Sequence, residues 1–478
     1  MRFLSLTALA ALALALSLAP GSSAQSIEPT PGITFPLAGK IRARAASEIK
    51  ASSWSIGGET LDRNFADYHQ YKNYLGPLGA KAIRLQAGWA RIEREPGSYD
   101  WAWLDAIIDD ALSQGVQPWL NLSYGNTLYP GGGDITLAAG LPTSPEALAA
   151  WNRWTRATVQ RYRTRVTAWE IWNEPDLSGK TPADQYLALF IPTAEMIRAE
   201  QPEGRIYALG LAGNAGFASQ FLKSLQTQNK LGLVDAITVH GYPQNPSETA
   251  SFGRWRELVA QFSDKIQVRQ GESGAPSFRV DKFALKNIDW TELTQAKWDL
   301  CRLVTHLAHD MPMNLFTLCD LHYVGTRHNG PNPKGLLKAN PDNTVAYAKP
   351  AYAAAQNVFA IFDSTWSALP SAKFTVADPA LAKRLSLYAL TTEAGTRGIV
   401  VWFGDKPPAA DNTPTPVTLS LVGARFSTPV LVDLRTGIVY DLPAETWKQN
   451  AASVTFTALP VYDAPVLITE KSALPLVK

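Results

Sequence analysis

Residues 166–176 read Val166-Thr167-Ala168-Trp169-Glu170-Ile171-Trp172-Asn173-Glu174-Pro175-Asp176, an apolar run that changes abruptly into polar residues. The apolar part, Val166–Trp172, predicts a buried β-strand. The polar part predicts a turn at the carboxyl end of that strand, where Pro175 disfavours helical geometry at Glu174. We therefore expect Glu174 at an extended strand tip. Similar apolar runs recur along the chain, and their spacing decides the fold.

Seven further apolar runs lie between residues 50 and 362, separated by segments with helical periodicity. They are Ser53–Gly58, Ala80–Gln86, Gln117–Ser123, Arg205–Leu211, Val234–His240, Lys265–Gly271 and Asn314–Cys319. The eight runs begin on average roughly 37 residues apart, a spacing typical of βα units. Alternating strands and helices predict a parallel sheet, and eight units predict a closed (β/α)8 TIM barrel over residues 51–362.

The intervening segments carry helix signals. Leu104–Leu112 and Gln295–His309 have the apolar spacing of amphipathic helices. A third helix is expected over Ser144–Tyr162, with Ser144 as N-cap and Pro145 at the first helical position.

After residue 363 the helical pattern gives way to short alternating strands. We expect them at Leu385–Thr391, Gly398–Phe403, Val417–Val422, Thr428–Asp433, Ser453–Ala458 and Val466–Thr469. Arg435-Thr436-Gly437 indicates a hairpin turn. Residues 363–478 thus predict an antiparallel β-sandwich, and residues 25–50 either a linker or a further strand of it.

The first 24 residues predict a secretory signal peptide. Arg2 precedes an almost wholly apolar run, Phe3–Leu18, and Ser22-Ser23-Ala24 is a small-residue cleavage site. We expect cleavage after Ala24 and a secreted or periplasmic protein. No other stretch approaches eighteen uninterrupted apolar residues, so no membrane insertion is expected of the mature form.

Composition excludes several classes of function. The net charge is +2 over 478 residues, without a basic run interleaved with aromatics, so nucleic acid is not an expected partner. The six histidines lack metal-site spacing, and no metal or cofactor is expected. Cys301 and Cys319 are interpreted as buried thiols, with a disulfide as the alternative. The 15 Trp and 16 Tyr fit either a large core or aromatic platforms for sugar rings.

Two glutamates carry the candidate chemistry. Glu174 follows the fourth strand, whereas Glu272, in Gly271-Glu272-Ser273-Gly274, follows the seventh. Catalytic side chains of such barrels project from the carboxyl ends of strands, and strands four and seven face each other across the mouth. Glycosidic cleavage needs one carboxyl group that protonates the leaving oxygen and one carboxylate that attacks the sugar or activates water. The substrate expected is an oligosaccharide or polysaccharide.

These motifs resemble the clan A retaining glycoside hydrolases, and family 39 most closely. The matching segments are Trp172-Asn173-Glu174-Pro175, Glu272, Arg84 in Ala82–Leu85, Glu95–Trp101, His240-Gly241-Tyr242, Gly335-Leu336-Leu337, Lys349–Tyr352 and Leu459–Asp463. The resemblance implies a retaining β-glycosidase in which Glu174 is the acid/base and Glu272 the nucleophile.

It also implies roles for four neighbouring side chains. Asn173 would bond the sugar 2-hydroxyl. Arg84 would lie beneath Glu272 and keep it ionised, with a barrel-interior ion pair as the alternative. His240 and Tyr242 would contact the nucleophile, Tyr242 as a donor, although His240 is equally expected as a core histidine.

Other candidate sugar contacts lie near expected strand ends, each as compatible with packing as with binding. They are Trp89, Tyr124, Asn126, Trp172, Asp320 and His322, with Glu59 and Arg63 after the first strand. Two other functions fit the same residues: a non-catalytic carbohydrate-binding protein and a transglycosylase.

Overall fold

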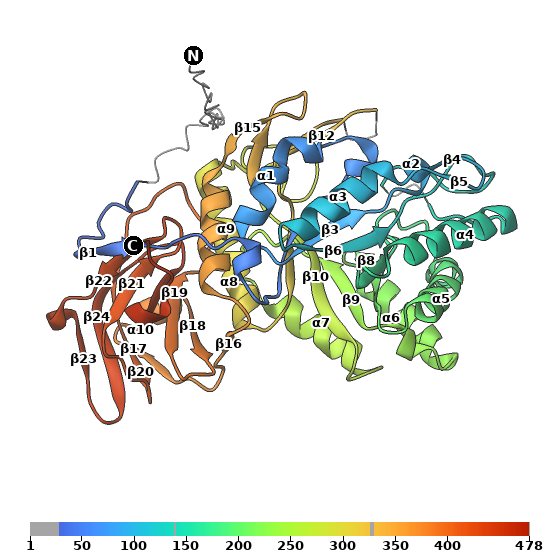
Figure 1. Cartoon of the computed structure of the whole chain (residues 1–478). Helices are drawn as coiled ribbons and strands as arrows, with labels where there is room; N and C mark the ends of the chain where they lie inside the picture. Colours follow the sequence, from blue (N-terminus) through green and yellow to red (C-terminus); the bar gives the residue numbers. More distant parts are fainter. Residues whose placement is uncertain (1–27, 138–139, 326–328, 478) are drawn as a thin grey trace, which may run out of the picture.

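The computed structural model describes residues 28–137, 140–325 and 329–477, so the predicted signal peptide lies outside the described residues. A barrel and a mostly antiparallel β-sandwich lie side by side (Figure 1). Within the described residues, no helix is both long enough and apolar enough to cross a bilayer.

Eight parallel strands close the barrel, which confirms the predicted TIM barrel. In chain order they are β2 (Trp54–Gly57), β3 (Ala82–Gln86), β6 (Gln117–Leu122), β7 (Ala168–Ile171), β8 (Arg205–Leu211), β9 (Ala236–His240), β10 (Gln267–Ser273) and β11 (Met313–Leu315). Each pairs with its neighbours, and β11 closes the ring against β2. The apolar runs located every strand because these strands are buried on both faces.

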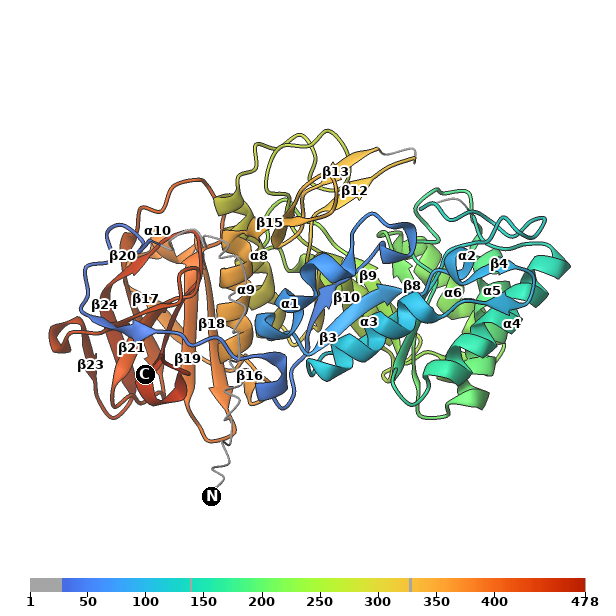
Figure 2. The same cartoon turned by 45° about the horizontal axis from the view of Figure 1, so that its top comes forward.

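Helices cover the outside of the barrel (Figure 2). They are α1 (Tyr68–Leu78), α3 (Ala102–Ser113), α4 (Pro145–Tyr162), α5 (Ala183–Glu200), α6 (Ala215–Thr227), α7 (Ala250–Ala260), α8 (Glu292–Ala308) and α9 (Pro350–Ile361). The N-cap prediction for α4 is confirmed, since Ser144 Oγ accepts from the backbone N–H of Ala147 at 3.1 Å.

Small elements follow the carboxyl ends of several barrel strands and build the rim of the mouth. A 3-10 turn (Leu61–Arg63) follows β2, and α2 (Trp89–Ile92) follows β3. The rim also contains three hairpins: β4 (Glu93–Glu95) with β5 (Ser98–Tyr99), β12 (Leu321–Tyr323) with β13 (Gly330–Asn332), and β14 (Leu337–Ala339) with β15 (Val345–Ala348).

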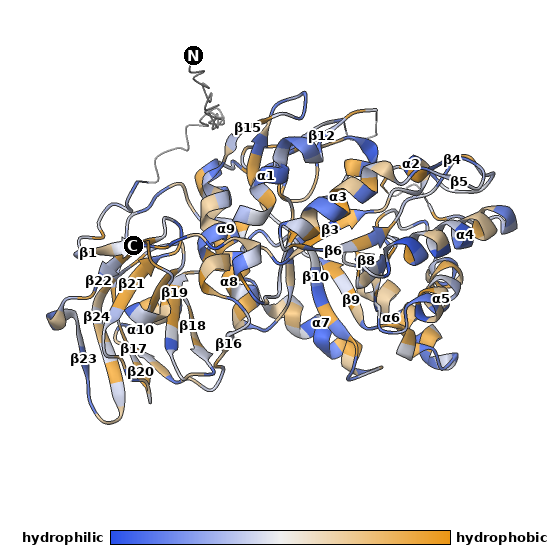
Figure 3. Cartoon of the chain, in the orientation of Figure 1, coloured by the Kyte–Doolittle hydropathy of each residue, from blue (hydrophilic) through white to orange (hydrophobic). Residues whose placement is uncertain are grey.

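The C-terminal part forms two antiparallel sheets. The larger has the order β1 (Leu37–Lys40), β22 (Ile438–Asp441), β21 (Pro429–Asp433), β25 (Val466–Glu470), β19 (Arg397–Phe403), β18 (Leu385–Thr392) and β16 (Trp366–Ala368). The smaller has β17 (Phe374–Val376), β20 (Thr415–Val422), β24 (Ser453–Val461) and β23 (Trp447–Gln449), and α10 (Pro379–Ala382) joins β17 to β18. Figure 3 shows apolar residues along β19 and β21.

Both ends of the described chain meet in the sandwich. Leu37–Lys40 pairs antiparallel with β22, so residues 25–50 contribute a strand rather than acting only as a linker. Ile41 bridges to Leu476 next to it. Gly437 adopts φ +72° in the turn between β21 and β22, as expected for the hairpin. Both cysteines are buried and free.

One buried lysine joins the barrel to the sandwich. The Lys297 side chain lies on α8 and is 0% exposed. Its Nζ donates to the Asp463 carboxylate at 2.5 Å and to the Ala409 carbonyl at 2.9 Å, both in the C-terminal part. A charged group without water must be paired, so this lysine holds the two parts in register.

We expect Lys297→Ala to lower the free energy of unfolding by about 3 kcal/mol, because it removes the cation paired with Asp463 and the donor to the carbonyls of Ala409 and Asp411. Urea unfolding followed by circular dichroism measures the loss. Lys223→Ala, at an exposed position of α6, should change stability by no more than about 0.5 kcal/mol. Equal stability of the two variants would contradict this role of Lys297.

Candidate active site

Glu174 lies just beyond the end of β7, but not in the extended conformation expected from Pro175. Trp172 has φ +67° and Glu174 φ +50°, both in the left-handed region. The prediction of an extended tip is wrong because the chain turns towards β8, where the Glu174 N–H donates to the Gly210 carbonyl at 2.8 Å. Such a conformation costs roughly 1–3 kcal/mol per residue and is typical of functional sites.

Glu272 lies within β10, since the strand extends to Ser273 rather than ending at Gly271. Tyr242 Oη donates to Glu272 Oε2 at 3.0 Å, and Arg84 Nη1 donates to Oε1 at 2.7 Å. Small neighbours leave the carboxylate room: a Cβ on Gly271 or Gly274 would approach other atoms closer than 3.0 Å. The segment therefore fits its surroundings only with glycine at these places.

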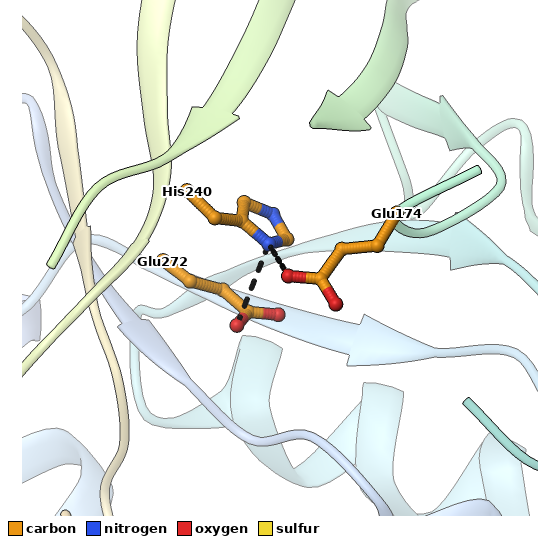
Figure 4. A group of neighbouring side chains, drawn as sticks. All are labelled: Glu174, His240 and Glu272. Atoms are coloured by element: carbon orange, nitrogen blue, oxygen red, sulfur yellow. Dashed lines mark hydrogen bonds and ion pairs between the residues drawn. The ribbon is translucent and has the colours of Figure 1, made fainter. Parts of the chain in front are cut away.

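Glu174, His240 and Glu272 converge on one point of the mouth (Figure 4). One side-chain oxygen from each glutamate and a ring nitrogen of His240 lie within 4.8 Å of one another. His240 Nδ1 lies 2.8 Å from Glu174 Oε1 and 3.5 Å from Glu272 Oε2. One oxygen of Glu174 therefore lies near one oxygen of Glu272. Retaining glycosidases, in which one carboxylate attacks the sugar directly, hold their carboxyl groups about 5–5.5 Å apart.

Arg84 lies beneath this cluster, fully buried, and binds several acids at once. Its Nη1 also donates to Glu59 Oε1 at 3.0 Å, and its Nε donates to Glu170 Oε2 at 2.8 Å. Its Nη2 donates to Asn173 Oδ1 at 2.7 Å. The guanidinium therefore joins residues from β2, β7 and β10 through its fixed planar fork.

The environment shifts the pKa values of Glu174 and Glu272 in opposite directions. Burial is the main cause that raises the pKa of Glu174. Burial also opposes ionisation of Glu272, but His240, Arg84 and the Tyr242 hydroxyl outweigh it and hold the pKa of Glu272 below its ordinary value. Two nearby carboxyl groups with opposite pKa shifts suit one acid and one ionised nucleophile.

The pKa values of Glu59 and His240 are also shifted. Burial raises the pKa of Glu59 to about 7 despite the Arg84 charge. Burial lowers the pKa of His240, yet the charges of Glu272 and Glu174 reverse this and raise it overall. A positive His240 would favour ionised carboxylates on both sides of it.

Asn173 is held in a fixed orientation. Its Oδ1 accepts from Arg84, and its Nδ2 donates to Tyr124 Oη at 2.8 Å. Glu170 lies deeper, fully buried, and accepts from Asn121 Nδ2 at 2.7 Å. Fixed partners of this kind position polar groups before a ligand arrives.

Two tryptophans expected as sugar contacts also pack against other aromatic rings. Trp89 is 0% exposed, stacks on Tyr129 and Trp154, and donates through Nε1 to Glu93 Oε2 at 2.5 Å. Trp172 is 4% exposed and packs edge-on against Tyr124. Trp89 also lines a pocket of about 360 Å³ beside the centre, so a sugar contact stays a prediction for both tryptophans.

Two polar candidates also hold the protein's own loops. Asn126 donates through Nδ2 to the Glu93 carbonyl at 2.9 Å and accepts from the Leu128 N–H at 3.0 Å. Asp320 accepts from Lys349 Nζ at 2.6 Å and from the Gly335 N–H at 3.0 Å. Both side chains are buried, and these hydrogen bonds satisfy backbone groups and a buried charge.

The remaining candidates divide between the centre and the rim. Glu59 and Tyr124 contact the centre through Arg84 and Asn173, whereas His322 Nε2 lies 3.4 Å from the Ala339 carbonyl, on the rim. Arg63 stacks over Tyr124 at 4.7 Å and lines a pocket of about 360 Å³ beside the centre. Lys334, which sequence reasoning missed, lies 5.5 Å from the Tyr242 ring centroid. It directly precedes Gly335-Leu336-Leu337, and the resemblance of that segment did not single out the lysine.

The donor atoms of Glu174, His240 and Glu272 are close enough to hold a metal ion. Arg84 already places a positive charge 2.7 Å from Glu272, which a second cation would repel. The arrangement therefore suits acid–base chemistry better than metal binding.

The chain resembles glycoside hydrolases in sequence and in structure. Residues 87–270 match the model of the glycosyl hydrolases of family 39. A β-xylosidase of Caldicellulosiruptor saccharolyticus is 29% identical over 193 residues, covering 36% of this chain and 39% of that protein. The alignments with curated relatives span only 26–39% of the relatives' length.

Two solved structures share the fold over most of the chain. A family 39 glycoside hydrolase of Bacteroides cellulosilyticus WH2 aligns with a TM-score of 0.64 and 16% identity over 87% of this chain and 80% of that one. A monomeric β-xylosidase of Caulobacter crescentus CB15 aligns with a TM-score of 0.58 and 18% identity over 91% and 97%.

We expect Tyr242→Phe to raise the pKa of Glu272, because the variant removes a hydrogen bond that favours the ionised carboxylate. Titration of the carboxyl carbon signal by NMR measures the shift. Tyr347→Phe, whose hydroxyl binds Glu292 on α8, should leave this titration unchanged. An unaltered or lowered pKa of Glu272 in Tyr242→Phe would show that the hydroxyl does not stabilise its charge.

Proposed function

Because the chain belongs to glycoside hydrolase family 39, we propose that it hydrolyses glycosidic bonds with retention of anomeric configuration. One observation carries the proposal: the carboxyl groups of Glu174 and Glu272 lie within 4.8 Å of each other and have opposite pKa shifts. Inverting enzymes hold their carboxyl groups about 6.5–9.5 Å apart to admit a water molecule between carboxylate and sugar.

In the first step, a Glu272 oxygen attacks the anomeric carbon while Glu174 gives its proton to the leaving oxygen. The carbon–oxygen bond of the substrate breaks, and an ester joins the sugar to Glu272. In the second step, ionised Glu174 takes a proton from water, whose oxygen attacks the anomeric carbon and displaces Glu272. Each carboxyl group then returns to its starting form.

The neighbours of Glu272 suit a nucleophile that must stay ionised and correctly aimed. Arg84 and Tyr242 bind opposite oxygens of the carboxylate, which fixes its plane. The Asn173 amide is anchored at both ends and can still offer its second N–H to a sugar hydroxyl. His240 contacts Glu174, so its charge would help the acid/base ionise before the second step.

We propose a β-linked oligosaccharide, such as a xyloside, as substrate. The support is the β-xylosidase name of the Caldicellulosiruptor relative and of the Caulobacter structure. Transglycosylation shares the covalent intermediate, and adding a sugar acceptor to the reaction would distinguish it from hydrolysis by its products. Export by cleavage after Ala24 is also a proposal, supported by the sequence of residues 1–24.

We expect Glu272→Ala to reduce hydrolysis of an aryl β-xyloside by roughly 10⁴-fold or more, because no other group can form the covalent intermediate. Added azide should restore turnover and yield a glycosyl azide of inverted configuration, which NMR identifies. Glu203→Ala, an exposed glutamate after α5, is the matched control and should keep full activity. Full activity of Glu272→Ala would rule out the mechanism.

We expect kcat/KM to follow a bell-shaped pH profile. Activity needs Glu272 ionised and Glu174 protonated. The acid limb should therefore lie below, and the basic limb above, the ordinary pKa of 4.5 for a glutamate. In Glu174→Gln the basic limb should vanish and the rate should fall roughly 10²–10⁴-fold. Glu59→Gln tests the assignment: if the basic limb vanishes there instead, Glu59 is the group that titrates.

A further inference from the structure

A pocket of about 360 Å³ opens beside the proposed catalytic centre and is rich in arginine. We call it the arginine pocket; its charged lining residues are Asp62, Arg63, Arg91 and Arg94. The loops after β2, β3 and β6 supply most of its wall. Tyr124 also lines it and accepts from Asn173 at 2.8 Å, so a ligand in the pocket would adjoin the centre.

The lining has an excess of positive charge. Three guanidinium groups face one carboxylate, Asp62, which pairs with Arg63 at 3.2 Å. Asp67 and Asp100 also act on Arg91, but neither lines the pocket. The lining therefore holds two cations more than anions.

The arginines differ in how many hydrogen bonds and ion pairs their guanidinium groups form with the protein. Arg63 is 7% exposed and uses its nitrogens on Asp62, Gln86 and the Ile135 carbonyl, so it serves mainly as a fixed positive wall. Arg91 stacks over Trp103 at 4.3 Å, and its Nη1 donates to the Leu61 carbonyl and to Asn64 Oδ1.

Arg94 is the most available cation. It is exposed, and within the described residues its side chain forms no hydrogen bond or ion pair. Burial lowers the pKa of Arg91 despite the nearby acids, with Arg94 adding to the effect, as expected of a cation that its neighbours do not fully neutralise.

Apolar side chains complete the site. Ile135 is 41% and Val324 74% exposed, and both line the same pocket as the guanidinium groups. A sugar with an acidic substituent matches this combination of apolar and cationic side chains. Its ring has apolar C–H faces, and its anion can accept paired N–H bonds from arginine.

We propose that the arginine pocket is a subsite for a sugar bearing an anionic substituent, a carboxylate or a phosphate, and that the substrate of the glycosidase proposed above is therefore acidic. The centre itself holds four glutamates around Arg84 and would repel such a group. Three arginines beside it offset that repulsion and fix where the anion lies.

The test measures binding to the Glu174→Gln protein by NMR or calorimetry, so that no turnover is needed. Three probes differ only at C6: methyl β-D-glucoside, methyl β-D-glucuronide and methyl β-D-glucoside 6-phosphate. At least one charged probe should bind roughly tenfold more tightly than the neutral one, and the better of the two identifies the substituent. Raising the salt from about 0.05 to 0.5 M should weaken that preference.

Arg94→Ser should remove most of the preference while changing the neutral probe's affinity less than about twofold. Arg205→Ser, at the exposed start of β8 on the opposite end of the barrel, should retain it. Equal binding of all probes, or a preference that survives Arg94→Ser, would overturn the subsite. Turnover of a neutral aryl β-xyloside by the wild type tests the glycosidase independently, so either proposal can fail alone.

Discussion

The site depends on one buried cation. Arg84 is fully buried and donates to three glutamates and an asparagine that lie on or just after β2, β7 and β10. Without it, several carboxylates would lie in the barrel interior without compensation, at a cost of several kcal/mol each. Burial alone would protonate them, as it partly does Glu59. The ionised state of Glu272 therefore depends on how the closed barrel brings β2, β3, β7 and β10 around one guanidinium.

The backbone next to Arg84 is strained, and aromatic packing offsets the free energy of this strain. Trp172 and Glu174 adopt left-handed backbone conformations. The Trp172 ring packs on Trp151, which packs on Trp89 and Trp154, and Asn121 Nδ2 donates to the Trp172 carbonyl at 2.7 Å. Buried aromatic area of this size stabilises by several kcal/mol. The packed tryptophans thus stabilise the strained turn that carries Glu174.

This explains what the sequence could and could not predict. The barrel strands and α4 were found because burial on both faces and an N-cap leave local marks. In the sandwich, the three-residue strands β16 and β23 escaped because their pairing is set by longer neighbours. At the site, motifs located Glu174, Glu272, Arg84 and Tyr242. The Trp89 ring packs on Trp154 of α4, and Asp320 pairs with Lys349 at the start of α9. Both partners lie far along the chain, so no local pattern could reveal these contacts.

Tyr124 joins the two chemical regions of the mouth. Its hydroxyl accepts from Asn173, which Arg84 holds, while its ring lies under the guanidinium of Arg63. On one side of Tyr124, the charged groups lie on or directly after barrel strands and are paired. On the other side, they lie on small elements within the connections that follow barrel strands, and Arg94 on β4 has no side-chain partner within the described residues. Strands fix reacting groups because their backbone cannot shift without breaking the barrel, whereas loops can change without that cost. Substitutions in the rim can thus change which sugar binds without moving the reacting carboxyl groups. Tyr124 contacts both regions and fixes their relative position.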